Sequence, residues 1–185
     1  SLKPEPSHEK KQVPTAVGRR LLLFLIVMQG MIQLSGPYFA PFMLKELQYS
    51  YLEFALLIGV AFATKGLAFS LWAHWARHRG PGWLLWMGAV GIVPIAALWL
   101  VSQNFYWLLF IQMLSGSAWA AYELGFFLMF FEALPVHKRT RMLTFYNLGN
   151  TTAWCLGALI GAGILTWLGT SYSSYLTLFG LSSVG

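Results

Sequence analysis

Five long apolar segments dominate the sequence and restrict it to a helical fold within a membrane. They cover residues 21–44, 51–72, 82–101, 105–131 and 142–168. Each is long enough to cross a bilayer, because a spanning helix needs about 20 predominantly apolar residues. None has the alternating polarity of a barrel strand, and backbone groups in lipid must be satisfied within a helix or a closed barrel. The sequence therefore predicts an all-α membrane protein.

A sixth apolar segment, residues 172–185, is shorter than the others. At about 1.5 Å of rise per residue it cannot cross an apolar layer of about 30 Å. We expect a six-transmembrane-helix bundle over residues 19–185 whose last helix is incomplete, in a sequence that is part of a longer polypeptide. Residues 1–18 are polar, contain three prolines and lack apolar periodicity. They are expected to form a flexible cytoplasmic tail or a linker between two halves.

The basic residues occupy every second gap between the apolar segments. Ten of the twelve lie before the first segment, around residues 74–81 or around residues 133–141: Lys3, Lys10, Lys11, Arg19, Arg20, Arg77, Arg79, Lys138, Arg139 and Arg141. Loops rich in Lys and Arg face the cytoplasm. The pattern predicts a multi-pass protein of the cell membrane with a cytoplasmic N-terminus.

Composition argues against soluble and nucleic-acid-binding classes. Only 10% of the residues are charged and 57% are hydrophobic, whereas soluble domains carry about 25% charged residues. The net charge of +6 is spread over separate links, while a nucleic-acid surface needs cations gathered on one face. We therefore expect the lipid bilayer and a small-molecule substrate as partners, and no nucleic acid.

Signatures of enzymes, metals and cofactors are weak. Cys155 is alone, which leaves no cysteine pair for a disulfide or a metal site. His74 and His78 are four residues apart, but the glutamate of the zinc-protease motif H-E-x-x-H is absent. We expect no enzyme, no metal and no cofactor. Two alternatives stay open at this point: an intramembrane enzyme, and a scaffold or receptor bundle that transports nothing.

The arrangement resembles one six-helix half of a transporter of the major facilitator superfamily. The resemblance covers nearly the whole chain and depends on cytoplasmic termini, on a basic link after the second segment and on a second basic link, LPVHKRTR, after the fourth. The family's first basic link typically reads G-x-L-a-D-R-x-G-R-R. The corresponding SLWAHWARHRGPG keeps Arg77, Arg79 and Gly80 but has no aspartate.

A degenerate link of this kind is commoner in the C-terminal half of such transporters, and the polar tail looks like the linker between halves. The resemblance implies secondary transport of a small solute by alternating access, with proton coupling as one candidate mechanism. It also implies a partner, which is either the other six-helix half of the same transporter or a second copy. The substrate, the coupling ion and the direction of transport do not follow.

Polar side chains inside the apolar segments are the candidates for substrate binding or coupling, because such groups are costly in lipid and usually face the bundle interior. They are Gln29, Gln33, Lys65, Gln112, Glu123, Asn147 and Asn150. Glu123 shares a helix face with Gln112 and is the first candidate for a proton carrier, because an uncharged carboxylic acid is cheaper to bury than a carboxylate. Alternatively, Glu123 forms a structural ion pair with Lys65, or Lys65 extends toward the cytoplasmic interface. The asparagines line the cavity or bond to a neighbouring helix.

Three further features carry expectations. Pro37 and Pro41 each remove a helix hydrogen bond, so the first segment should kink in its outer half, as a gate or as a static bend. Arg77 or Arg79 could contact Glu132 in a cytoplasmic latch, or these residues could form a solvated charge cluster. The glycines of the fifth segment, Gly157, Gly161 and Gly163, should form a packing face for another helix.

Overall fold

The computed structural model describes residues 15–133 and 136–184, and it is helical throughout with short links. The elements are α1 (Thr15–Ser35), a 3-10 turn (Gly36–Tyr38), α2 (Phe39–Pro41), a π-helical turn (Phe42–Glu46), α3 (Tyr51–Arg79), α4 (Pro81–Leu98), α5 (Phe105–Ala133), α6 (Val136–Leu168) and α7 (Tyr172–Val184). The described residues include no strand, and five helical segments are long and apolar enough to cross a membrane. The all-α membrane bundle is therefore confirmed.

The helices extend further at the basic links than the apolar segments predict. α1 begins at Thr15, inside the predicted tail, whose residues 1–14 lie outside the described part. α3 continues through Arg79, and α6 begins at Val136. Cations in the last turn of α3 are favourable because they lie near the negative end of the helix dipole. Gly80, with a φ of 84°, ends that helix in a conformation that suits glycine.

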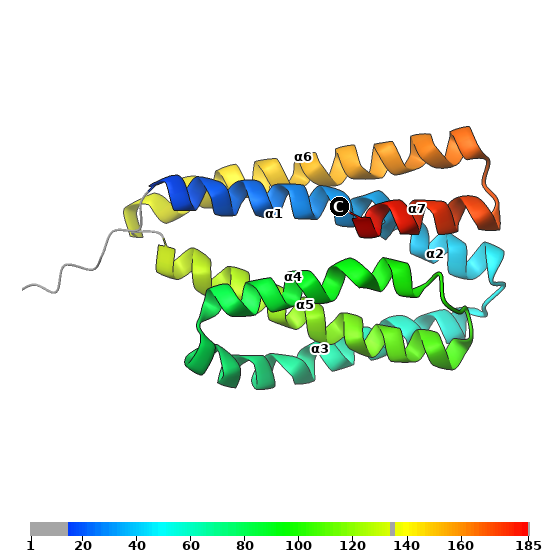
Figure 1. Cartoon of the computed structure of the whole chain (residues 1–185), viewed down its shortest axis with the longest axis horizontal. Helices are drawn as coiled ribbons and strands as arrows, with labels where there is room; N and C mark the ends of the chain where they lie inside the picture. Colours follow the sequence, from blue (N-terminus) through cyan, green and yellow to red (C-terminus); the bar gives the residue numbers. More distant parts are fainter. Residues whose placement is uncertain (1–14, 134–135, 185) are drawn as a thin grey trace, which may run out of the picture.

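The helices form two groups of three (Figure 1). α1, α6 and α7 lie together, while α3 and α4 both pack along α5. The start of α1, the α3–α4 turn, the end of α5 and the start of α6 lie at one end of the molecule, here called the basic end, and the other described links lie at the opposite end. The charge pattern predicted this alternation of ends.

Glycines let the helices within each group approach closely. A Cβ added at Gly157 would lie 2.5 Å from the carbonyl oxygen of Gly30, and one at Gly161 would lie 2.3 Å from that of Leu34. The packing face predicted for α6 is therefore confirmed at these two positions. It is wrong for Gly163, where an added Cβ would meet nothing within 4 Å, because this residue points away from α1.

The first membrane segment changes helix type where its prolines occur. The 3-10 turn contains Pro37, Pro41 ends α2, and the π-helical turn follows. These changes confirm the predicted irregularity, since proline cannot donate to the preceding turn. Ser182 of α7 donates a hydrogen bond of 2.8 Å to the carbonyl oxygen of Met31, and Ser35 donates one of 2.9 Å to Ser182. The bend is thus fixed against α7.

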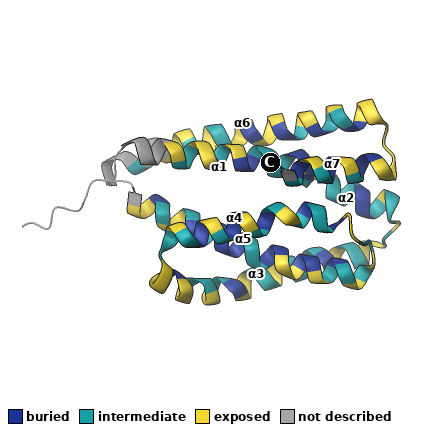
Figure 2. Cartoon of the chain, viewed as in Figure 1, coloured by how far each residue is buried: buried dark blue, intermediate teal, exposed yellow. Residues whose placement is uncertain are grey.

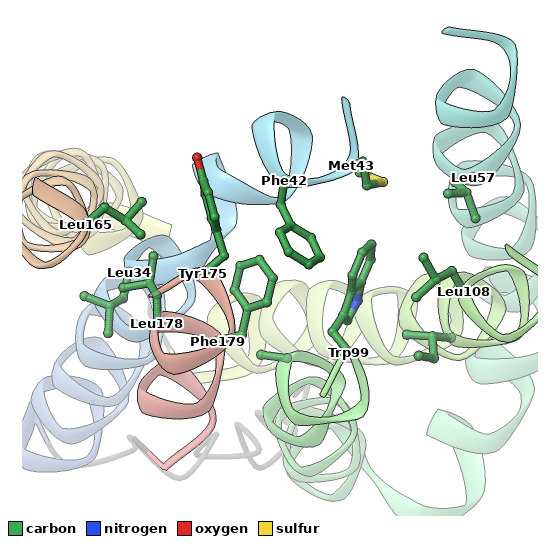
Figure 3. Close-up of a cluster of buried hydrophobic side chains, with 12 residues drawn as sticks. Leu34, Phe42, Met43, Leu57, Trp99, Leu108, Leu165, Tyr175, Leu178 and Phe179 are labelled. Atoms are coloured by element: carbon green, nitrogen blue, oxygen red, sulfur yellow. The ribbon is translucent and has the colours of Figure 1, made fainter. Parts of the chain in front are cut away.

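Two apolar clusters join the two helix groups. The first, near the end opposite to the basic end, brings together side chains from every long helix around Phe42, Trp99 and Phe179 (Figure 3). The second, nearer the basic end, contains Leu25, Met28, Leu85, Ala89, Ile92 and Tyr122. Much of the outer surface of α3 and α6 is exposed (Figure 2) and carries large apolar side chains such as Leu67 and Trp167. A lipid-facing surface has this character.

The links at the opposite end are also tied together. Ser50 and Glu53 form a capping box at the start of α3. Tyr49 donates a hydrogen bond of 2.6 Å to the carbonyl oxygen of Gln103, which connects the first link with the third. Burial, with a smaller contribution from the Glu53 carboxylate, raises the pKa of the Tyr49 hydroxyl above its ordinary value. The neutral hydroxyl therefore remains available as a donor.

Candidate functional site

A cavity of about 400 Å³ lies between the two helix groups. It shares Met28 and Ile92 with one apolar cluster and Met43 and Trp99 with the other, so it lies between the clusters near the middle of the bundle. Its volume falls in the range of small-molecule sites. All six long helices contribute residues to its lining, although α3, α6 and α7 contribute only Ile58, Trp154 and Ser182.

The cavity has several polar groups and no charged side chain among its lining residues. Gln29 of α1 and Gln112 of α5 are 8% and 9% exposed and face the cavity, together with Gln33 and Ser115. An amide side chain offers two donors and one acceptor oxygen, so it can bind hydroxyl, carbonyl or amide groups of a ligand. Three of the seven predicted binding residues are thus brought together here.

Aromatic rings form much of the remaining wall. Phe39, Trp99, Trp119 and Trp154 line the cavity, and reasoning from polar residues alone missed them. A signal was present for one of them, because Trp119 lies four residues after Ser115, which also lines the cavity. Residues spaced by four share a helix face. Such rings can stack on the apolar face of a ligand while the amides fix its orientation.

Lys65 and Glu123 form an ion pair that joins α3 to α5. The Lys65 Nζ donates to the Glu123 Oε1 at 2.6 Å, and the side chains are 24% and 36% exposed. This contact is the structural ion pair that the sequence offered as one alternative. Neither residue lines the cavity, so the two charged candidates are separate from the amides.

The position of this pair relative to the cavity follows from the helix geometry. Lys65 lies seven residues after Ile58 on α3, and Glu123 lies eleven residues after Gln112 on α5. Both spacings are close to whole numbers of turns and correspond to about 10 Å and 16 Å along the helices. The ion pair therefore lies on the same helix faces as cavity-lining residues, displaced toward the basic end.

Close contact between α3 and α5 positions this pair. A Cβ added at Gly116 would lie 2.2 Å from the carbonyl oxygen of Ala61 and 3.0 Å from the backbone nitrogen of Lys65. Further along α3, the Trp72 indole donates to the carbonyl oxygen of Ser117 at 2.9 Å. The absence of a side chain at Gly116 thus sets the separation across which Lys65 reaches Glu123.

The two asparagines of α6 lie outside the cavity lining. Asn147 is exposed. The Oδ1 atom of Asn150 is buried and accepts no hydrogen bond from the described residues. Tyr146, on the same helix, packs its ring on Phe126 of α5 with centroids 4.7 Å apart. This end of α6 therefore approaches α5 through an aromatic contact, and a role for the asparagines stays a prediction.

The predicted latch residues do not meet in this structure. Within residues 15–133 and 136–184, Arg77 and Glu132 form no ion pair, and both are exposed. Arg79 instead lies over the ring of Trp83, with its guanidinium carbon 5.4 Å from the centroid. Because α3 stays helical through Arg79, these arginines project from its last turn rather than from a loop.

The two histidines of α3 lie at its exposed end, with ring centroids 5.1 Å apart: His74 and His78. A metal site would need at least one more ligand beside them. Across the described ranges, no group of three or more His, Cys, Asp or Glu side chains could hold a metal ion.

A protein-family model matches most of the chain. The family described as Major Facilitator Superfamily matches residues 21–184, which is nearly the entire sequence. No curated protein and no solved structure matches the chain.

Proposed function

The chain belongs to the major facilitator superfamily, and we propose that it moves a small uncharged solute by alternating access. It is a multi-pass membrane protein of a family of transporters. In the proposal it acts as a six-helix half together with a second half, and its basic end faces the cytoplasm. The observation that carries this proposal is the charge-free cavity of about 400 Å³ between the helix groups.

The lining supports the choice of an uncharged solute. A ligand charge without a partner in an apolar, largely desolvated site would cost several kcal/mol, and the lining residues include no side chain of opposite charge. Gln29, Gln33 and Gln112 instead suit neutral hydrogen-bonding groups. An amphipathic neutral molecule with a ring or another flat apolar face would match both the amides and the tryptophans.

The bend in the first membrane segment supports the conformational part of the proposal. Gly36 and Phe39 line the cavity immediately beside Pro37, so movement at this bend would change the cavity wall. Ser182 holds the end of α1, next to the bend, through two hydroxyl hydrogen bonds. Such bonds contribute about 0.5–1.5 kcal/mol each, which is small enough to break and reform during a transport cycle.

We also propose that Glu123 couples transport to protons. Protonation would remove its charge and with it most of the attraction to Lys65, so the restraint between α3 and α5 would weaken. The location of the pair, toward the basic end from the cavity, suits a group that senses the cytoplasmic side. The alternative is a purely structural ion pair, which would affect stability without changing the pH dependence of transport.

The binding site can be tested before a substrate is known. The purified protein would be screened by thermal unfolding against a panel of matched solutes, such as glucose and glucuronate, or phenylethanol and phenylacetate. A ligand that binds the folded state raises its stability by RT ln(1 + [L]/Kd). We expect neutral members to stabilise the protein more than their anionic counterparts. Preferential stabilisation by the anions would contradict the proposed substrate class.

Transport itself would be measured as counterflow of a stabilising solute in proteoliposomes that contain the full-length protein with both halves. Gln112→Ala should weaken binding of that solute about 5- to 100-fold, because a buried polar group of the ligand would lose its partner. Cys155→Ala, at an exposed position outside the cavity, serves as the control. A stabilising solute that shows no counterflow with the wild-type protein would refute transport, and an unchanged pH profile in Glu123→Gln would refute proton coupling.

A further inference from the structure

Cationic and aromatic side chains gather around the α3–α4 turn, and neither the cavity nor the ion pair uses them. Arg77, His78 and Arg79 form the last turn of α3 and are exposed. Trp75 stacks on Trp83 of α4, with centroids 6.3 Å apart and planes 20° apart. We propose that this cluster is a binding site for the headgroup of an anionic phospholipid.

The length of α3 places the cluster at the right depth. The helix has 29 residues and is therefore about 43 Å long. The apolar layer of a bilayer is about 30 Å thick, and the bilayer measures about 40–45 Å with its headgroups. With the capped start of α3 at the opposite surface, its last turn reaches the headgroup layer. The arginines are then level with lipid phosphates.

The tryptophans mark the same boundary. Trp75 is 47% exposed, and Trp86, one turn into α4 from Trp83, is 60% exposed. Indole rings favour the membrane interface, because they combine an apolar body with one polar N–H group. The Trp72 indole, in contrast, is bonded to α5, which anchors this part of α3. The exposed indoles therefore lie where acyl chains meet headgroups.

The geometry of Arg79 suits a phosphate ligand. Its guanidinium lies on the Trp83 ring at 5.4 Å, a contact that positions the group through its planar face. The N–H groups at the edge of the plane can then donate to two oxygens of one phosphate. The exposed Arg77 adds a second cation on the same turn, and its predicted acidic partner, Glu132, forms no ion pair with it. A phosphodiester can supply the missing negative charge.

Lipid binding would be measured by native mass spectrometry of the purified full chain in detergent. The probes are phosphatidylglycerol and phosphatidylcholine with identical acyl chains. We expect tighter binding of phosphatidylglycerol. Each arginine near an anionic lipid should increase the preference for phosphatidylglycerol over phosphatidylcholine about fivefold. The double variant R77Q/R79Q should therefore reduce this preference about 25-fold. Lys45→Gln, which removes an exposed cation near the opposite end, should leave the preference unchanged.

Two further measurements separate a lipid site from a surface that attracts any anion. Trp83→Leu keeps both arginines but removes the ring on which the Arg79 guanidinium lies, so it should reduce the preference for phosphatidylglycerol about two- to fivefold. This variant tests the proposal if R77Q/R79Q does not fold. Inorganic phosphate at the lipid concentration should not displace phosphatidylglycerol, because it lacks the acyl chains that hold the lipid at this depth. Equal binding of the two lipids, an unchanged preference in folded R77Q/R79Q and in Trp83→Leu, or displacement by phosphate would each overturn the proposal.

Discussion

Gly116→Ala should separate α3 from α5 at the turn that carries Lys65. The added methyl carbon would lie 2.2 Å from the carbonyl oxygen of Ala61, whereas favourable contacts of carbon lie near 3.5 Å. That oxygen belongs to the backbone, so no side-chain rotation can relieve the contact. α3 must move outward by about 1 Å, and the packing around it must loosen.

The expected size of this effect combines two opposing terms. Overpacking of a tightly packed site costs about 1–3 kcal/mol. Replacing glycine by alanine inside a helix gains about 0.5–1 kcal/mol, because glycine loses more conformational freedom on folding. A net loss of about 1–2 kcal/mol should result. Gly66→Ala is the matched control: Gly66 follows Lys65 directly on α3, and an added Cβ there would meet nothing within 4 Å. It should be neutral or slightly stabilising.

The assay is unfolding by sodium dodecyl sulfate in mixed micelles, followed by far-UV circular dichroism. Gly116→Ala should lower the free energy of unfolding, whereas Gly66→Ala should leave it unchanged or raise it slightly. The comparison of the two variants therefore does not depend on the absolute stability of the protein. If Gly116→Ala proved as stable as Gly66→Ala, the inferred contact between α3 and α5 would be wrong, and with it the account of how Lys65 is positioned.

Three further predictions concern polar contacts. Glu123→Gln should lower stability by about 1–3 kcal/mol, between the values for exposed and buried pairs, and Lys65→Met with Glu123→Leu should recover most of this loss in the same unfolding assay. Ser182→Ala should cost about 1–2 kcal/mol, because two hydrogen bonds to the end of α1 are lost; an unchanged midpoint would show that these two bonds do not stabilise the fold. Above pH 10, ionisation of Tyr49 should destabilise the fold, since its pKa is raised in the folded state, so the midpoint should fall less steeply with pH in Tyr49→Phe than in the wild type.

The sequence predicted the membrane class, the succession of helices and the ends at which the links lie. These properties depend on the length of apolar runs and on where cations stand, both of which can be read along one dimension. The irregularity at Pro37 could also be predicted, because it depends on the proline itself and not on the packing of distant residues. The ends of the helices were predicted less accurately. The arginines and histidines before residue 80 indicated a loop, but these residues also form helices, so α3 continues to Arg79 and ends at Gly80.

The candidate site was predicted only in part, because it depends on how each helix is rotated about its axis. Gln29 and Gln112 are buried and line the cavity, and their role in binding stays a prediction. Glu123 is also polar, but it lies near the surface of α5 that packs on α3, where it forms the ion pair with Lys65. No periodicity distinguishes a cavity-facing tryptophan from a lipid-facing one when the helix is apolar all round, so Trp99 could be assigned only from the packing.

The pairing of α1 with α6 has a consequence for biosynthesis. More than 100 residues separate Gly30 from its contact at Gly157, and ribosomes add about 5–20 residues per second. For about 10 s, therefore, α1 is in the membrane before the surface that packs against it has been made. During this interval Gln29, Gln33 and Ser35 lack α6 and α7, and the carbonyl freed by Pro37 faces lipid, water or the insertion machinery. The amides that suit a binding cavity therefore make membrane insertion of the nascent α1 less favourable. The effect of substitutions in α1 should be measured on insertion efficiency as well as on activity.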